Sequence, residues 1–213
     1  MHAEFWLDRW REGKIAFHEG RTNTFLARHA ERFAPKSRIL VPLCGKAHDM
    51  LFLAACGHRV LGVEVAEEAV SAFFADNELP FERRPLGPFE AWESGPITIL
   101  CGDFFATTPE LMAEHGVNAL YDRAALVALP KDMRQRYAAH VRTLLPAGAR
   151  ALVITFEYPQ EQMAGPPFSV DEPELRALYA GLAAEQIDSA MADAPRFTDA
   201  GVGAIERVFT LAF

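Results

Sequence analysis

Charged side chains stand directly after three apolar runs that are expected to form strands: Glu64, Asp103 and the pair Asp122-Arg123. Ligands of open parallel sheets bind at the carboxyl ends of the strands, so these side chains are expected to share one site. A carboxylate there suits the hydroxyls of a ribose. Glu64 also follows a glycine turn by about 20 residues, the spacing typical of nucleoside sites. The working hypothesis is therefore a site for a nucleoside-containing cofactor.

Each of the other charged groups has a plainer interpretation. Asp103 either accepts a hydrogen bond from an adenine amino group or caps the turn that follows it. Asp122 either faces a ligand or caps a helix, and Arg123 either faces a ligand or is solvated. Their position at the edge of the predicted sheet favours the functional interpretation of all three.

The turn in front of Glu64 restricts the kind of cofactor. Residues 39–64 are expected to form a strand, a tight turn, a helix and a second strand, and the turn VPLCGK contains a single glycine, Gly45. Dinucleotide-binding turns usually read G-x-G-x-x-G, because a pyrophosphate needs several close approaches of the backbone. This turn therefore favours a ligand without phosphates. S-adenosylmethionine, an adenosine joined to an amino acid through a sulfonium, is such a ligand.

Strands and helices alternate along the chain until two final strands. Helices are expected over residues 3–11, 22–33, 67–77, 130–144 and 173–185, and strands over 39–41, 60–63, 97–101, 117–121, 151–157, 186–192 and 203–213. Residues 80–96 are expected to form an excursion with at most a short strand. This order predicts one α/β domain over residues 1–213, a doubly wound, mostly parallel sheet. The last two strands are expected to form a C-terminal antiparallel hairpin with a short loop.

Residues 1–34 are expected to cap this domain as helices. Trp6 and Trp10 are four residues apart in the first helix and therefore share a face. The helix either docks on the domain through these rings or acts as a lid over a ligand. The loop behind it carries Phe17, and exposed aromatics at this place are expected to cover something.

Composition excludes several classes of partner. The net charge is −8, and no basic cluster offers the phosphate contacts that a nucleic acid requires. No apolar stretch is long enough to span a membrane and no signal peptide is recognisable. Three cysteines without a C-x-x-C or a Cys/His cluster indicate a reducing compartment and no metal site. A cytoplasmic monomer is expected.

Seven segments then carry a specific resemblance: FWLDRW, GKIAFH, VPLCGKAHDM, GHRVLGVE, CGDFF, YDRAALVALP and GPPF. In this order and spacing they resemble the thiopurine S-methyltransferase family, in particular its bacterial members. The match runs over nearly the whole chain, and residues 193–203 depart from the pattern. The resemblance implies a class I S-adenosylmethionine-dependent methyltransferase fold. It also implies methyl transfer to the sulfur of a small aromatic or heterocyclic thiol, and a detoxification role.

The same motifs imply the contacts of the cofactor: Trp10, Leu43, Glu64, Asp103, Phe104 and Arg123. Phe17 would border the acceptor pocket. Arg123 would either favour the acceptor thiolate, as the catalytic residue, or hold the cofactor carboxylate. Asp122 as a general base is a second alternative, and Cys44 is not expected to act as a nucleophile. Direct in-line transfer is expected, because the sulfonium is already activated and aromatic thiols ionise readily.

Two other functions stay open. The first is a methyltransferase that acts on selenium or tellurium compounds, halide or sulfide. The second is a protein that binds S-adenosylmethionine without catalysis. The aromatic residues Trp6, Phe17 and Phe168 favour a flat organic acceptor over an inorganic one.

Overall fold

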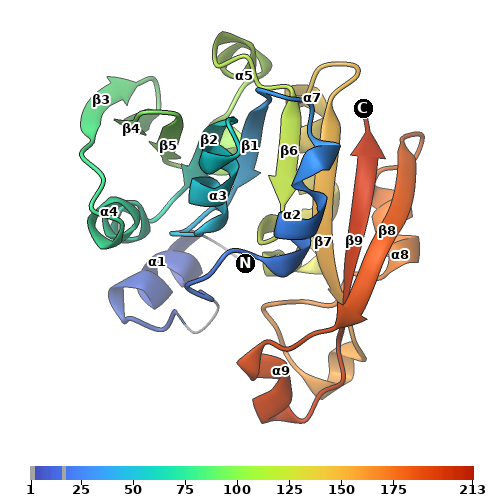
Figure 1. Ribbon diagram of the computed structural model, residues 1–213. Helices are drawn as coiled ribbons and strands as arrows, with labels where there is room; N and C mark the ends of the chain where they lie inside the picture. Colours follow the sequence, from blue (N-terminus) through green and yellow to red (C-terminus); the bar gives the residue numbers. More distant parts are fainter. Residues whose placement is uncertain (1–2, 16–17) are drawn as a thin grey trace.

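The computed structural model describes residues 3–15 and 18–213, and within this part nine strands form one sheet in the order β3-β4-β5-β2-β1-β6-β7-β9-β8 (Figure 1). The strands are β1 Arg38–Pro42, β2 Arg59–Glu64, β3 Glu82–Leu86, β4 Phe89–Ser94, β5 Ile97–Cys101, β6 Ala119–Asp122, β7 Arg150–Glu157, β8 Ala183–Met191 and β9 Ile205–Ala212. No helix of the described part is long and apolar enough to cross a membrane.

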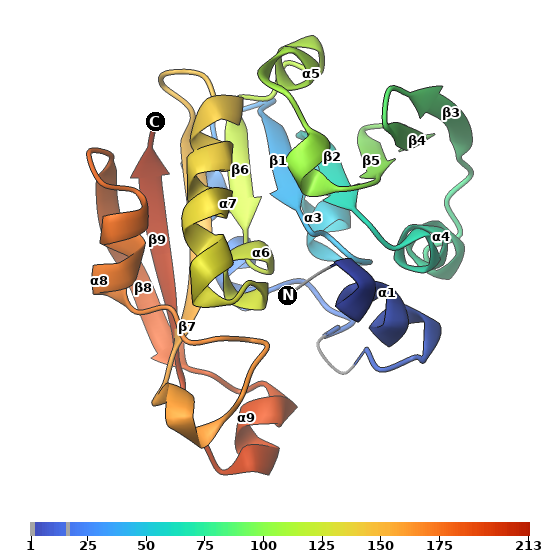
Figure 2. The same cartoon turned by 180° about the vertical axis from the view of Figure 1, so that it is seen from behind.

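Helices cover both faces of the sheet. They are α1 Ala3–Arg11, α2 Thr24–His29, α3 Asp49–Ala55, α4 Glu67–Asp76, α5 Pro109–Glu114, α6 Ala125–Ala128, α7 Lys131–Leu144, α8 Glu172–Leu178 and α9 Pro195–Ala200, with short 3-10 turns η1 Ala30–Arg32, η2 Phe104–Ala106 and η3 Gln160–Gln162. α2 and α3 lie on one face of the sheet (Figure 1), and α7 lies on the other (Figure 2). Each face has its own buried core cluster. The doubly wound α/β fold is therefore confirmed.

The five central strands, β5, β2, β1, β6 and β7, are parallel. Their side chains are almost all buried, as expected for strands covered on both faces. The close packing around Gly62 explains why β2 contains a glycine at this position. A Cβ at this position would lie 2.8 Å from Cys44 Sγ and 3.1 Å from Met50 Sδ. The glycine therefore lets α3 and the turn before it approach the strand closely.

The C-terminal antiparallel hairpin is confirmed, but its connection is not the expected short loop. β9 pairs antiparallel with both β7 and β8, and the helix α9 lies in the connection from β8 to β9. The helix expected over 173–185 is also too long. Gly181 has φ of +87°, a left-handed conformation that does not continue a helix. Residues from Ala183 onward therefore pair in the sheet.

The expectation for residues 80–96 is wrong, because they form the hairpin β3–β4 and extend the sheet beyond β5. Phe89, Ala91 and Trp92 are buried in β4. The charged strand β3, which contains one proline, is exposed because it is the edge strand. Charge and proline are tolerated there, since the outer side of an edge strand has no ladder to complete.

Candidate active site

A cavity of about 690 Å³ lies at the carboxyl ends of the parallel strands. Helices α1 and α9, far apart in the sequence, stand on either side of that end of the sheet (Figure 2). The cavity wall includes every residue expected to bind the cofactor: Trp10, Leu43, Glu64, Asp103, Phe104 and Arg123. The fold therefore brings these six dispersed residues to one place.

Glu64 ends β2 and is only 6% exposed. Its Oε2 accepts a hydrogen bond of 2.8 Å from the Gly45 N–H, and its Oε1 accepts one of 2.9 Å from the Ala66 N–H. Burial raises the pKa of Glu64, and the backbone donors offset part of that shift. Each carboxylate oxygen has a second lone pair, so the oriented carboxylate can still accept two hydroxyl donors. Two oriented acceptor oxygens fit the two hydroxyls of a ribose.

The turn after β1 packs against the ring of Trp10 in α1. Leu43 and Gly45 both have positive φ, +49° and +52°. A Cβ on residue 45 would lie 3.2 Å from the Trp10 ring, so glycine allows this close contact. Cys44, between them, is buried, and burial raises the pKa of its thiol well above the usual value. Its exclusion as a nucleophile agrees with this environment.

Asp103 caps the turn that follows it and also lines the cavity. Its Oδ1 accepts a hydrogen bond of 2.9 Å from the Phe105 N–H and caps η2, so the capping interpretation is confirmed. Its side chain is also exposed to the cavity, and Phe104 beside it is buried and lines the same wall. The ring of Phe104 lies 5.4 Å from that of Tyr137, centroid to centroid.

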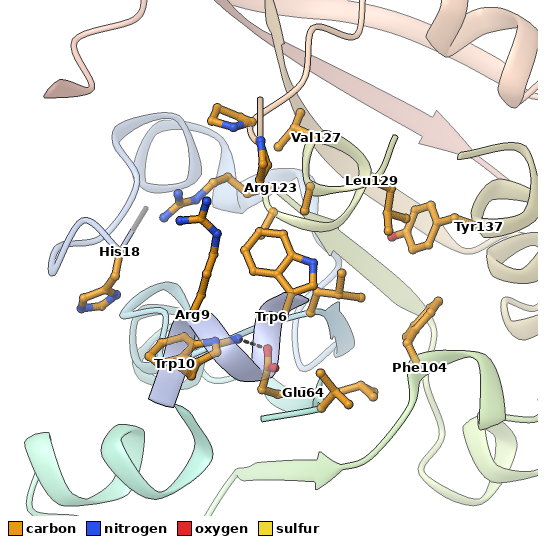
Figure 3. A pocket seen from close by; sticks show the side chains of 18 of the residues that line it. Trp6, Arg9, Trp10, His18, Glu64, Phe104, Arg123, Val127, Leu129 and Tyr137 are labelled. Carbon is orange, nitrogen blue, oxygen red and sulfur yellow. Dashed lines mark hydrogen bonds between the residues drawn. The ribbon is translucent and has the colours of Figure 1, made fainter. Parts of the chain in front are cut away.

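Arg123 lies in the cavity wall (Figure 3). It forms ion pairs with two carboxylates. Its Nη1 is 3.5 Å from Glu19 Oε1, and its Nε is 3.5 Å from Asp49 Oδ2. Asp49 is almost fully buried and accepts hydrogen bonds from the Asn23 N–H and the Tyr121 hydroxyl. Burial alone lowers the pKa of Arg123, but the Asp49 and Glu19 charges reverse the shift and raise it. Arg123 is therefore a fixed cation.

Asp122 is fully buried and does not belong to the cavity wall. It accepts hydrogen bonds from the N–H groups of Ala125 and Leu126, and one of 2.7 Å from the Tyr137 hydroxyl. Burial raises the pKa of Asp122 to about 6. The capping interpretation is confirmed, and the general-base alternative has no geometric support. Tyr137 does line the cavity, so Asp122 positions that ring.

The expected aromatic wall is realised only in part. Trp6 and Trp10 both line the cavity. Trp10 also packs on Ala69 of α4 and on Ala66, which precedes that helix. Helix α1 therefore docks on the domain and covers the cavity at once. Phe168 is not a lining residue, although its neighbours Pro166 and Pro167 are. Phe17 lies outside the described residues, so its role stays a prediction.

Several lining residues were not expected: Arg9, Glu19, Arg21, Tyr137, Asp193 and Arg196. Arg9 carries a signal in the sequence, because it lies three residues after Trp6 and shares its helical face. Arg196 carries none, since it comes from the segment that departs from the family pattern. Asp49 supports Arg123 from α3, and no spacing in the sequence links residues so far apart.

The chain matches known proteins over nearly its whole length. The family model of thiopurine S-methyltransferase matches residues 1–212. A thiopurine S-methyltransferase of Pseudomonas putida is 46% identical over 214 residues, which cover 98% of this chain and 98% of that protein. One of Bordetella petrii is 49% identical over 183 residues, or 85% of this chain and 83% of that protein.

Solved structures share the fold at low sequence identity. A 1,6-didemethyltoxoflavin-N1-methyltransferase of Burkholderia thailandensis, with bound 1,6-didemethyltoxoflavin and S-adenosylhomocysteine, has a TM-score of 0.66. It is 17% identical and covers 99% of this chain and 87% of its own. TehB of Haemophilus influenzae has a TM-score of 0.62 at 13% identity, over 89% of this chain and 61% of its own.

Proposed function

The chain belongs to the thiopurine S-methyltransferase family, and we propose that it methylates the sulfur of small aromatic or heterocyclic thiols. It is a methyltransferase whose cofactor is S-adenosylmethionine. The observation that supports the thiol acceptor most directly is the cavity itself. Apolar and aromatic side chains continue from the cofactor residues to the far wall: Phe104, Val127, Leu129, Tyr137, Phe156 and Phe197. Such a wall suits a flat organic ring.

The cofactor would be held from both sides of the cavity. Glu64 would accept the ribose hydroxyls, Asp103 and Phe104 would border the adenine, and Trp10 and Leu43 would enclose the remaining part. When bound, S-adenosylmethionine supplies a methyl group on a sulfonium, which we propose a thiolate takes by direct in-line displacement. The acceptor thiol would lose its proton to solvent on ionisation. Its sulfur would then form a bond to the methyl carbon as the bond from that carbon to the sulfonium breaks and S-adenosylhomocysteine leaves.

Arg123 would stabilise the acceptor thiolate electrostatically and would not transfer a proton. Its carboxylate partners keep it cationic and fix its position, so it can favour an anionic sulfur next to it without a base. An aromatic thiol ionises near neutral pH, so orientation and exclusion of water would supply most of the rate. The alternative, in which Arg123 holds the cofactor carboxylate, predicts that Arg123→Gln lowers cofactor affinity.

We further propose that α1 alone forms the lid. α2 belongs to the N-terminal region expected to cap the domain, but its Phe25 and Leu26 are buried in the core cluster on the sheet. α1, in contrast, shares only a small buried cluster with α4. The moving part of residues 1–34 would therefore be the first helix.

Transfer of a labelled methyl group tests the function. The panel holds aromatic thiols, aliphatic thiols, sulfide, halide and selenium oxyanions, each with labelled S-adenosylmethionine. We expect turnover with the aromatic thiols at the highest kcat/KM. Faster transfer to an inorganic acceptor would contradict the proposed substrate class. Cofactor binding without transfer to any acceptor would point to a non-catalytic role.

A further inference from the structure

Among the described residues, three of the five arginines that line the cavity have no acidic partner within 4 Å: Arg9, Arg136 and Arg196. Of the arginines that line it, Arg123 is paired with Glu19 and Asp49, and Arg21 with Asp193. Arg9 and Arg196 make no ion pair within 4 Å and no hydrogen bond with any residue of the described part, 3–15 and 18–213. The Arg9 guanidinium lies over the Phe5 ring and that of Arg136 over the Phe105 ring. Arg9 and Arg196, but not Arg136, each have a buried Nε without a hydrogen-bond partner. Buried donors without an acceptor are unfavourable, so an occupant with acceptor atoms would stabilise both.

The two guanidinium groups come from opposite sides of the cavity. Arg9 extends from α1, and its guanidinium points toward Arg123 (Figure 3). Arg196 belongs to α9, beside the ends of β8 and β9. Burial lowers the pKa of Arg196, Tyr158 offsets part of that shift, and the positive charge of Arg9 makes a smaller contribution that lowers the pKa again. Two cations that line the same cavity repel each other, and an anion bound between them would relieve that repulsion.

We propose that Arg9 and Arg196 together bind a carboxylate carried by the acceptor, so that the favoured acceptors are aromatic thiols with an anionic substituent. This inference rests on the proposed thiol methylation and names a narrower substrate class for the same cavity. A planar carboxylate offers two acceptor atoms, which match the forked donors of guanidinium groups. The net charge of the whole chain is −8 and does not predict a preference for anions. The preference would come from two positive charges inside the cavity.

The position of Arg196 favours the acceptor over the cofactor as the source of the carboxylate. Glu64 and Asp103 follow β2 and β5, on one half of the sheet. α9 connects β8 and β9 at the other edge of the sheet, beyond β6 and β7. An anion bound by Arg196 therefore lies on the side of the cavity away from the ribose site. Because Arg9 is on α1, such an acceptor would also hold the lid against the domain.

A matched pair of acceptors tests this inference: 4-mercaptobenzoate and its neutral methyl ester. The wild type is expected to show the lower KM for the acid. Arg9→Gln and Arg196→Gln should each raise the KM for the acid by about tenfold or more, the usual effect of losing a charge-assisted hydrogen bond. The KM for the ester should stay within about twofold, the scale of a change outside any direct contact. Arg9→Lys, which keeps the charge, should retain part of the preference.

A binding measurement, which needs no turnover, shows whether the arginines bind the carboxylate of the acceptor or that of the cofactor. Calorimetry with S-adenosylhomocysteine is expected to give the same affinity for wild type, Arg9→Gln and Arg196→Gln. Calorimetry with 4-(methylthio)benzoate, the methylated product, should show weaker binding to both variants. The matched control is Arg11→Gln, which removes a charge from an exposed position of the same helix and should change none of these values.

Three outcomes would overturn the inference. The first is a wild type with no preference for the acid. The second is an equal rise in KM for both acceptors. The third is a loss of S-adenosylhomocysteine affinity in the variants, which would assign the arginines to the cofactor. Turnover of the ester in each of these cases leaves the proposed function intact, whereas no transfer to any thiol would refute the function itself.

Discussion

Buried carboxylates near the cavity have distinct partners, and the partners decide what each can do. Glu64 is held by backbone N–H groups and still borders the cavity. Asp49 forms an ion pair with Arg123 and accepts a hydrogen bond from the Tyr121 hydroxyl. Asp122 accepts hydrogen bonds from a helix N-terminus and from the Tyr137 hydroxyl. Of these three, only Glu64 is placed to meet a ligand directly, and the others fix residues that do.

Replacement of Glu64 is expected to weaken cofactor binding. Glu64→Ala removes two acceptors for the ribose hydroxyls, and it should lower the affinity for S-adenosylhomocysteine by roughly 1.5 to 3 kcal/mol, or about 10- to 150-fold. Isothermal titration calorimetry measures this directly. Glu82→Ala, at an exposed position of β3, is the control and should have no effect. Unchanged affinity in Glu64→Ala would reject the ribose role.

Asp122 is expected to make stability depend on pH. Its pKa is about 6 in the folded protein against an ordinary 3.8. The folded state therefore keeps a proton that the unfolded state has lost. Stability thus falls as the pH rises from about 4 to about 6, by about 3 kcal/mol in total. Asp122→Asn cannot ionise and should lack this loss.

Urea unfolding of wild type and Asp122→Asn between pH 4 and pH 7 measures the difference. The other titrating groups are common to both proteins, so they cancel. Asp122→Asn should gain stability relative to wild type as the pH rises. A difference that stays constant over this range would show that the carboxyl group has an ordinary pKa.

The sequence predicts which residues share the cavity wall where the residue is tied to a strand end. Glu64, Asp103 and Arg123 follow apolar runs, so the geometry of parallel sheets places them together. Leu43 and Trp10 came from motifs of the family resemblance. Glu19, Asp49 and Arg196 could not be predicted, because they reach the site through contacts between distant segments that no local pattern encodes.

At the scale of elements, α3 packs closely on β2 because Gly62 has no side chain. Gly62→Ala would place a methyl group 2.8 Å from Cys44 Sγ and 3.1 Å from Met50 Sδ. Overpacking of this kind is expected to destabilise the protein by about 1–3 kcal/mol. Chemical denaturation measures the change.

A double-mutant cycle identifies the clash as the cause. Cys44→Ala removes the nearer atom, so Gly62→Ala should cost less in that background than in wild type. Gly203→Ala is the matched control, since its nearest neighbour would be an ordinary contact of 3.9 Å to Met191. Strict additivity of the two substitutions would assign the destabilisation to another origin.

Elements with strong periodicity were predicted well, and those fixed by tertiary pairing were not. The amphipathic α7 and the buried strand β5 lie where the pattern places them. The hairpin β3–β4 was missed because edge strands carry the charge and proline of loops. Residues 183–185 read as helix from their alanines, and pairing with β9 overrides that propensity.

At the scale of the whole molecule, α1 is expected to be less stable than the sheet without ligand. It shares one small buried cluster, Trp10 with Ala66 and Ala69, with the domain. Few buried contacts allow local opening at low free energy. Amides of α1 should therefore exchange quickly in the free protein and slow down when S-adenosylhomocysteine binds.

Hydrogen exchange followed by mass spectrometry tests this coupling. Peptides from β1, in the middle of the sheet, serve as the internal reference and should stay protected in both states. Slow exchange of α1 in the free protein, or no change on ligand binding, would argue that the helix is a fixed part of the domain and not a lid.

The place of β9 sets the order in which the chain can complete its site during synthesis. β9 follows β8 in the sequence but lies between β7 and β8 in the sheet. On the ribosome, β8 has no strand to pair with until β9 has emerged and inserted beside β7. Arg196, in the connection between them, stays unanchored until that moment. A nascent chain would therefore form the strands that end near Glu64 and Asp103 before Arg196 is anchored, and the part of the cavity next to α9 would be the last to form.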